Sequence, residues 1–436
     1  MLVLSTQVNS DGNAYDVTDY GAVSDGTTDN TQAFMDTWNA TCKSGGTMVI
    51  PAADGNFLVD KIELSGPCSH QVTFQLDGVI LAPEGNPYSG CWFTFYGISD
   101  LTIQGSGMFD GNGPSAWEHC PVCAASIGLY AINNAHIQGI TSLNSKAAHF
   151  VIDGGDGMTF ENINITAPGD SPNTDGINMA NSSNIHIINS NIGTGDDCVA
   201  IAQGSTNINI KGVNCGPGHG ISIGSIGKVA DDKDVQGVNV QSCTITSAQN
   251  GLRIKAWAPS YPVTVSNVTY QDITINNASN PIVIDQTYCF IDKECPGVSK
   301  VQISNVKYRG VTGTSATQVA VNLQCSNSTP CQDIYLENID LSLTGGGQTS
   351  SSCANVNVTY SGTQNPPPLA PKLSWCHLLF SHQSDMVSEF GSLYIFILIA
   401  TLKHLDSGSN GRQIINLCGV LTSNRSSEKH LLVYTD

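Results

Sequence analysis

The sequence predicts an all-β chain that folds as a right-handed parallel β-helix, a solenoid in which short strands wind into stacked coils. The composition is the first indication, because 44 glycines in 436 residues and only 12% charged residues favour strands and tight turns. A recurring phrase is the second: alternating apolar residues precede a small polar residue in "MTFENINIT", "IHIINSNIG" and "VQISNVKY". Between these phrases no helical periodicity intervenes, which is the third.

The spacing of the phrase distinguishes a solenoid from other all-β folds. Its small polar residue recurs at intervals of 23 to 38 residues, at Gly139, Asn162, Asn189, Gly212, Ser242, Asn267, Asn305 and Asn338. A period of this kind is typical of coils that cannot bury their inner faces alone and therefore stack. We expect the recurrent asparagines to form ladders at the bends. The alternative, a β-sandwich, is disfavoured because the phrase repeats so faithfully.

The N-terminal region departs from the repeat. Residues 1–13 begin with "MLVLSTQV", which is apolar but short and lacks a basic start, so we interpret them as the remnant of a leader. The stretch "DNTQAFMDTWNATCKSGG" then places Ala33, Phe34, Trp38 and Cys42 at helical spacing and ends in two glycines. This pattern predicts one short helix that caps the end of the solenoid.

The repeat predicts a domain over residues 14–362 and a different segment after it. The Pro-rich "TQNPPPLAPK" interrupts the pattern, and residues 363–436 form an atypical tail without the phrase. Residues 369–436 hold five Lys/Arg and five Asp/Glu, so the net charge of −19 lies entirely upstream. We expect this tail to be disordered or foreign to the native fold; the alternative is a lineage-specific extension.

Cysteines and glycosylation sequons indicate the secretory route. The chain has 15 cysteines, and Asn-x-Ser/Thr sequons begin at Asn39, Asn164, Asn181, Asn267, Asn277, Asn327, Asn357 and Asn424. The close pairs Cys289/Cys295 and Cys325/Cys331 are interpreted as disulfides; the alternative is free thiols in a cytosolic protein. We therefore expect a secreted, cell-wall protein.

Two cysteine features stay open at this point. The motif Cys120–Cys123 has no second CxxC, so another disulfide or two loop thiols fits it better than metal or redox chemistry. Thirteen cysteines precede the tail, so one of them, Cys353, lacks a partner unless Cys376 or Cys418 supplies it.

The charge balance restricts the partners. A net charge of −19 is opposite to that of a nucleic-acid-binding protein. An acidic polymer as substrate would need a local cationic site against this field. No segment reaches about 18 apolar residues, which predicts no membrane span; the stretch from Leu393 to Leu402 comes closest.

Unusual polar residues gather between residues 173 and 255. "SPNTDGIN" contains Asp175, "GTGDDC" contains Asp196 and Asp197, "CGPGHGISIGS" contains His219, and "GLRIKAW" contains Arg253 and Lys255. Asp175 and Asp196 are 21 residues apart, and Asp196 and His219 are 23 apart, each close to one coil. Because residues one coil apart stack in a solenoid, these side chains should meet on successive coils.

The clustered carboxyls suit hydrolysis of a glycosidic bond. This reaction needs one protonated carboxyl for the leaving oxygen and one ionised carboxyl for water or attack. Crowding raises the pKa of at least one carboxyl, and the cations suit a polysaccharide that bears carboxylates. Neighbours in a strand face opposite sides, so Asp196 and Asp197 can share a groove only if the backbone bends, and we expect a bulge at Gly195. Singly, each motif could instead be a turn, a calcium site or a solvated strand face.

Together, "NTDG", "GDDC", "GHGISIGS" and "RIK" resemble the four motifs of the polygalacturonases, the pectin-cleaving glycoside hydrolases of family 28, in order and at fitting spacing. The segment "YDVTDYGAVSDGTTDNTQAF" resembles the N-terminal region of plant members, and the resemblance covers about residues 14–362. It implies hydrolysis of α-1,4-galacturonosyl linkages in polygalacturonate, with inversion and without a cofactor or metal. It also implies a disulfide between Cys198 and Cys215.

The resemblance implies a role for each matching residue. Asp196 would be the general acid, Asp175 and Asp197 would activate water, and His219 would support the protonation state of the acid. The substrate-binding residues would be Arg253, Lys255, Tyr288 and Asn173.

Two rival functions remain at this point. A calcium-dependent pectate lyase uses the same fold, although "DDC" and "GHG" fit hydrolysis better. A non-catalytic or misfolded wall-associated homologue is the other. The expected partner is pectin, with no nucleic acid and no membrane, and the expected state is a monomer. Whether attack is internal (endo) or terminal (exo) depends on whether loops close one end of the groove.

Overall fold

The computed structural model describes residues 13–85, 89–119, 123–289 and 297–368, together with the backbone of four short strands beyond them. These residues fall into two units, divided after residue 380. In the second unit, β34 (Phe396–Leu398), β35 (Gly419–Thr422) and β36 (His430–Val433) form an antiparallel sheet. The expectations for a leader and for the tail concern mainly residues outside the described ones.

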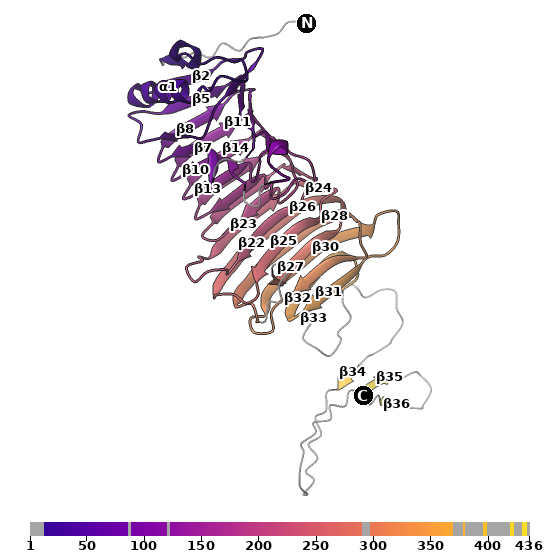
Figure 1. The fold of residues 1–436 in the computed structure, drawn as a ribbon. Helices are drawn as coiled ribbons and strands as arrows, with labels where there is room; N and C mark the ends of the chain where they lie inside the picture. The colour runs from indigo at the N-terminus through magenta and orange to yellow at the C-terminus, as the bar shows by residue number, and fades with distance from the viewer. Residues whose placement is uncertain are drawn as a thin grey trace. The chain divides into compact units, whose positions relative to one another are not determined.

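The first unit is a stack of coils built from two parallel sheets (Figure 1). Each coil contributes one strand to an 11-stranded sheet, which runs through β4 (Ile62–Ser65), β7 (Cys91–Tyr96), β10 (Ala125–Tyr130), β13 (Phe150–Asp153), β16 (Ile177–Ala180), β19 (Val199–Ile201), β22 (Ile221–Ile226), β25 (Asn250–Trp257), β27 (Asn280–Tyr288), β29 (Val319–Gln324) and β31 (Ser350–Ala354). All pairings between the described strands of this sheet are parallel. The predicted right-handed parallel β-helix is confirmed, and the sandwich alternative is wrong.

The remaining strands of this unit form a continuous 22-stranded sheet on the other sides of the coils. Its strands are β1 (Ala14–Asp16), β2 (Gly46–Ile50), β3 (Asn56–Leu58), β5 (Val72–Leu76), β6 (Val79–Leu81), β8 (Ser99–Gln104), β9 (Met108–Asp110), β11 (Asn133–Gln138), β12 (Thr141–Leu143), β14 (Asp156–Glu161), β15 (Asn164–Thr166), β17 (Ser183–Ile188), β18 (Asn191–Gly193), β20 (Thr206–Lys211), β21 (Asn214–Cys215), β23 (Val235–Gln241), β24 (Thr244–Thr246), β26 (Val263–Ala278), β28 (Val301–Ser315), β30 (Cys331–Leu343), β32 (Val356–Asn365) and β33 (Leu378–Leu379). The last full coil thus ends three residues beyond the predicted Gly362.

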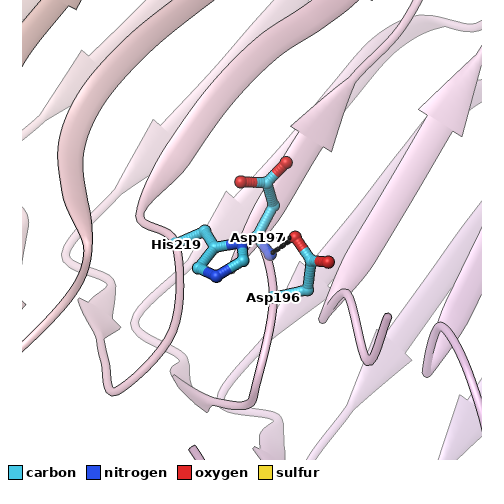
Figure 2. A group of neighbouring side chains, drawn as sticks. All are labelled: Asp196, Asp197 and His219. Carbon is cyan, nitrogen blue, oxygen red and sulfur yellow. Dashed lines mark hydrogen bonds and ion pairs between the residues drawn. The ribbon is translucent and has the colours of Figure 1, made fainter. Parts of the chain in front are cut away.

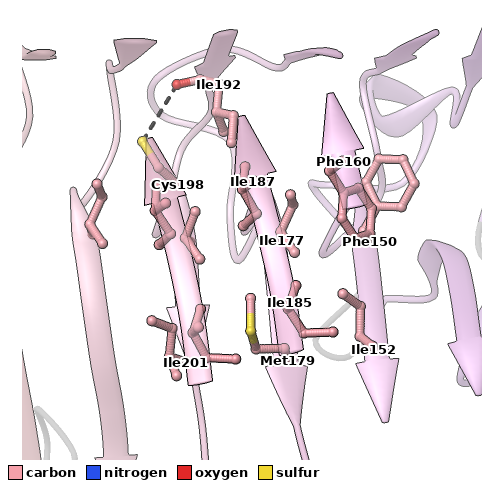
Figure 3. Close-up of a cluster of buried hydrophobic side chains, with 14 of the residues drawn as sticks. Phe150, Ile152, Phe160, Ile177, Met179, Ile185, Ile187, Ile192, Cys198 and Ile201 are labelled. Carbon is pink, nitrogen blue, oxygen red and sulfur yellow. Dashed lines mark hydrogen bonds between the residues drawn. The ribbon is translucent and has the colours of Figure 1, made fainter. Parts of the chain in front are cut away.

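The core lies inside the coils, where one apolar side chain stacks on the next (Figure 3). Strand β13 points Phe150 and Ile152 inward, and the parallel register places them beside Ile177 and Met179 of β16. All four side chains are at most 1% exposed. The period-2 alternation therefore buries alternate residues of each strand and leaves the others on the outer face.

The small polar residues of the repeated phrase share one backbone conformation. All eight markers, from Gly139 to Asn338, have φ between 48° and 74°, the left-handed region that Gly and Asn tolerate best. The first five markers lie between two strands, and the last three, Asn267, Asn305 and Asn338, lie inside the long strands β26, β28 and β30. The predicted ladders form in part, since Asn305 Nδ2 donates to Asn267 Oδ1 at 2.6 Å and Asn214 Nδ2 donates to Asn191 Oδ1 at 2.9 Å.

The predicted helix is α1 (Thr31–Ser44), and it packs on the first strands of the stack (Figure 1). Phe34 and Trp38 are buried against the core, and Trp38 Nε1 donates to Ser65 O at 3.0 Å. A disulfide joins Cys42 to Cys68. The helix thus covers apolar surface that an open first coil would expose to water. Two short 3-10 helices, Val17–Tyr20 and Gly113–Ser115, complete the elements.

The disulfides agree with most of the sequence expectations. Bonds join Cys198 to Cys215 and Cys325 to Cys331. Cys123, Cys289 and Cys353 are also disulfide-bonded, which resolves the open question about Cys353; Cys120, Cys295, Cys376 and Cys418 lie outside the described residues. The described residues contain two free thiols, Cys91 and Cys243, and both are buried.

No helix in the described part of the chain has the length and hydropathy of a membrane span.

Candidate active site

Three polar residues occupy the same position on three successive coils. The register pairs Ile177 of β16 with Val199 of β19, and Val199 with Ile221 of β22. Asp175, Asp197 and His219 each lie two residues before these strand positions. Backbone hydrogen bonds continue the alignment, because Gly176 N donates to Asp197 O at 2.8 Å and Cys198 N donates to Gly220 O at 2.9 Å. We call Asp175, Asp197 and His219 the polar column; the predicted stacking of these coils is confirmed.

The adjacent carboxylates lie in a bend between strands. Strand β18 ends at Gly193 and β19 begins at Val199, so the predicted bend is present, but it lies between two strands and is not a bulge within one. Two backbones approach closely at this bend, and only glycine fits there, because a Cβ on Gly195 would lie 1.9 Å from Ser171 O. Outside a regular strand, neighbours need not face opposite sides, and the carboxylates of Asp196 and Asp197 point in different directions (Figure 2).

Asp197 is buried and bonded to two cationic side chains. It is 1% exposed, and its Oδ1 accepts from Arg253 Nη2 at 2.6 Å and from Ser222 Oγ at 2.7 Å. Its Oδ2 accepts from Lys255 Nζ at 2.9 Å. Sequence reasoning missed Ser222, although the parallel register sets it directly beside Arg253. Alternation within "GHGISIGS" gave the signal, because Ser222 must face outward when Ile221 and Ile223 face the core.

Asp196 pairs with His219 across neighbouring coils. Its Oδ1 lies 2.8 Å from His219 Nδ1 and accepts the backbone N–H of Asp197 at 2.8 Å. Burial raises the pKa of Asp196, but the hydrogen bond and charge of His219 and the charge of Lys255 outweigh it. The pKa of Asp196 is therefore below its usual value of 3.8.

The pKa of Asp175 is shifted in the opposite direction. Burial, followed by the charges of Asp197 and Asp196, raises the pKa of Asp175 well above 3.8, against a hydrogen bond at 2.7 Å from Asn178 Nδ2. The resting site thus favours a proton on Asp175, whereas the expected general acid is Asp196. The two groups are linked, because protonation of Asp196 removes one of the charges that raise the pKa of Asp175. When Asp175 and Asp196 together hold one proton, one of the two carboxyls can act as an acid and the other as a base.

A groove of about 920 Å³ runs over the polar column. All eight residues predicted from the sequence line it, together with Asn178 and Gln249, which were missed: Asn173, Asp175, Asp196, Asp197, His219, Arg253, Lys255 and Tyr288. Lys255 Nζ lies 5.5 Å from the ring centroid of Tyr288, and this ring meets that of Trp257 edge-on at 5.0 Å. Carboxyls, two cations and the Tyr288 ring therefore line one groove, in which Asp197 is bonded directly to both cations.

Three residues of the groove lie close enough together to hold a metal ion. Asp196, Asp197 and His219 each offer a ligand atom, and these atoms lie within 4.8 Å of one another. Calcium prefers six to eight oxygen ligands, but the oxygens of Asp197 already accept from Arg253, Lys255 and Ser222. A divalent cation would also meet two side-chain cations. The donor set suits proton transfer better than calcium binding.

Comparisons with known proteins agree with this geometry. The family model described as "Glycosyl hydrolases family 28" matches residues 42–362. The chain is 40% identical over 374 residues to an exopolygalacturonase of Platanus acerifolia, which covers 82% of this chain and 98% of that protein. It is 42% identical over 367 residues to a polygalacturonase of Prunus persica, which covers 81% of this chain and 92% of that protein.

Solved structures share the fold. The polygalacturonase of Erwinia carotovora superimposes with a TM-score of 0.63 at 25% identity, covering 80% of this chain and 96% of the other. An exopolygalacturonase of Thermotoga maritima superimposes with a TM-score of 0.66 at 18% identity, covering 80% of this chain and 92% of the other.

Proposed function

The chain belongs to glycosyl hydrolase family 28, and from this premise we propose that it hydrolyses α-1,4-galacturonosyl linkages in polygalacturonate with inversion at the anomeric carbon. The observation that carries the proposal is the groove itself. It joins a proton-sharing set of carboxyls, Asp175 and Asp196, to the cations Arg253 and Lys255. This combination fits a glycosidic bond between sugars that bear carboxylates.

In the proposed reaction, Asp196 protonates the leaving oxygen, with the proton supported by His219. Asp175 and Asp197 activate a water on the opposite face of the sugar. An inverting pair needs about 6.5–9.5 Å between the two carboxyls for this water. Substrate binding excludes bulk water from Asp196 and so favours its protonated form. The proton then leaves Asp175, which becomes available as a base.

The cations would orient the substrate. Arg253 and Lys255 are each bonded to Asp197, which fixes their side chains in the groove before substrate arrives. Their remaining N–H groups can bind a galacturonate carboxylate, while the Tyr288 ring bounds that subsite and Asn173 offers an amide. A fixed set of donors loses less conformational freedom on binding.

We also propose that the protein is secreted to the cell wall and acts as a monomer. The sequon asparagines within the described residues are all exposed, as N-glycosylation requires: Asn39, Asn164, Asn181, Asn267, Asn277, Asn327 and Asn357. The disulfides suit the same oxidising route.

The proposed function is tested by incubating the full chain with polygalacturonate at about pH 5 in the presence of EDTA. We expect new reducing ends without a rise in absorbance near 235 nm. An ultraviolet signal that requires calcium would identify a lyase and contradict the proposal. Neither signal from a folded protein would identify a non-catalytic homologue.

We expect a bell-shaped pH dependence of kcat/KM. The active form needs one protonated and one ionised carboxyl, so activity should be lost below the lowered pKa of Asp196 and above the raised pKa of Asp175. In His219→Ala the acid limb should move to higher pH, because His219 lowers the pKa of Asp196. His136→Ala is the matched control and should leave the profile unchanged, because it removes a histidine of β11 that pairs with Glu161 of β14. A rate that rises up to pH 9 would contradict the assignment.

A further inference from the structure

We propose that the groove is closed on the N-terminal side of Asp175, so that one terminal galacturonate fits there and the enzyme acts as an exo-hydrolase. This inference rests on the proposed function and concerns how the polymer lies in the groove. It follows from what occupies the polar column on the preceding coils.

On the coils before that of Asp175, apolar residues occupy the position that the polar column has on the later coils. The register pairs Phe150 with Ile177, so the position equivalent to Asp175 on the coil of β13 is Ala148. On the two coils before it the same position holds Ala125 and Cys91, which are paired directly. These three residues form an apolar cluster and are 8%, 6% and 4% exposed. One coil spacing is about 4.8 Å, comparable with the length of one sugar residue.

Side chains of the outer face cover this apolar cluster. Tyr130 of β10 reaches back across the sheet, and its hydroxyl lies 3.1 Å from Cys91 Sγ. Its ring lies over Gly128, where an added Cβ would come within 2.6 Å of Tyr130 Cε2. Val151 packs against the same cluster. An open groove would leave these positions to the substrate, whereas here protein atoms occupy them.

Buried hydrogen bonds hold the rim of this region in place. Lys146 is 5% exposed, and its Nζ donates to Pro83 O at 2.8 Å across two coils. Trp117 Nε1 donates to Ser145 O at 3.1 Å. Described residues that precede β7, β10 and β13 are thereby joined by hydrogen bonds. A sugar ring could enter only by breaking these contacts.

Charge gives an independent argument. Strands β4, β7, β10 and β13 contain no lysine or arginine. The lysines nearest to the apolar cluster, Lys146 and Lys61, already donate to Pro83 O and Ser89 O. A galacturonate carboxylate placed on the cluster would lose its water and could reach a cation only in competition with these bonds, which is costly. Arg253 and Lys255 line the groove on the other side of the scissile bond and can bind a carboxylate there. The polymer should therefore extend from Asp175 toward β25 and β27 only.

The wild-type enzyme tests this directly. We expect galacturonate monomer as the sole early product from polygalacturonate, with little loss of viscosity at low conversion. Tetragalacturonate labelled at its reducing end should give trimer and monomer, and the label shows which end is removed. Dimers, or a ladder of oligomers from the polymer, would overturn exo action while leaving hydrolysis intact. Absence of any new reducing ends would overturn the proposed function and this inference with it.

A variant tests the closure. Tyr130→Ala removes the covering ring, and we expect oligomers among the early products at a rising share, with the rate of monomer release reduced. Tyr96→Ala is the matched control, because the register places Tyr96 beside Tyr130 on the preceding coil and its side chain is 51% exposed. Tyr130→Phe keeps the ring and should keep the monomer-only pattern. Unchanged products from a folded Tyr130→Ala variant would count against the ring as the barrier.

Discussion

Asp196→Asn should lower kcat on polygalacturonate by about 10²–10⁴-fold, the range that a general acid contributes. The amide keeps the shape of the carboxyl, and its oxygen can still accept the backbone N–H of Asp197. The amide group cannot act as a general acid, because it cannot give a proton to the leaving oxygen and regain one from water. We therefore expect the melting temperature to change little while turnover collapses, as measured by reducing-end assays and thermal unfolding.

The control and the discriminating substrate sharpen this prediction. Asp340→Asn removes a carboxylate from β30, outside the groove, and should leave activity unchanged. An aryl α-galacturonide with an acidic phenol needs no proton on its leaving group, so Asp196→Asn should regain much of its rate on it. Asp175→Asn should not regain its rate on this substrate, because this variant lacks the base. Recovery by Asp175→Asn alone would show that the raised pKa of Asp175 marks the acid and that the two roles are exchanged.

Asp197→Asn should destabilise the fold as well as remove activity. Breaking a buried ion pair by removing one partner costs about 3–5 kcal/mol of unfolding free energy, because a buried charge is left uncompensated. Here two cations would be left, since Arg253 and Lys255 both bond to Asp197 and have side chains only 12% and 11% exposed. Urea denaturation followed by fluorescence gives the measurement.

A double variant separates charge from packing in this network. Asp197→Asn combined with Lys255→Met removes one of the stranded cations and should recover part of the lost stability. The double variant should remain inactive, because both water activation and substrate orientation are lost. A melting temperature of Asp197→Asn equal to that of the wild type would show that water reaches the cations and that the network is not buried in solution.

Most of the fold followed from the recurring phrase, for a physical reason. Residues such as Asn162 and Asn189 must enter the left-handed region at each bend, and side chains that tolerate it are few, so the sequence marks each turn. The stacking of Asp175, Asp197 and His219 followed in turn, because a parallel register repeats position with coil length.

Other features could not be predicted in this way. The adjacent carboxylates predict a bend at Gly195, but its place between two strands, close to the backbone of Ser171 in the preceding coil, does not follow from local alternation. The opposite pKa shifts of Asp175 and Asp196 depend first on the burial of each carboxyl and then on the charges and hydrogen-bond donors that the neighbouring coils place beside it. The cover over Ala148, Ala125 and Cys91 depends on the direction of the Tyr130 side chain. Each of these features depends on how residues of different coils contact one another, which local sequence patterns do not specify.

The order of strands in the 11-stranded sheet has a consequence for partial unfolding. The strands that carry or flank the polar residues, β16, β19, β22 and β25, have four strands before them and three after them in this sheet. Stacked repeats interact with nearest neighbours, so such arrays open from their ends first. Opening of a terminal coil would leave the reacting groups in register. Native-state hydrogen exchange should therefore find the amides around Asp197 among the slowest in the chain, and catalytic competence should outlast the first losses of structure on heating.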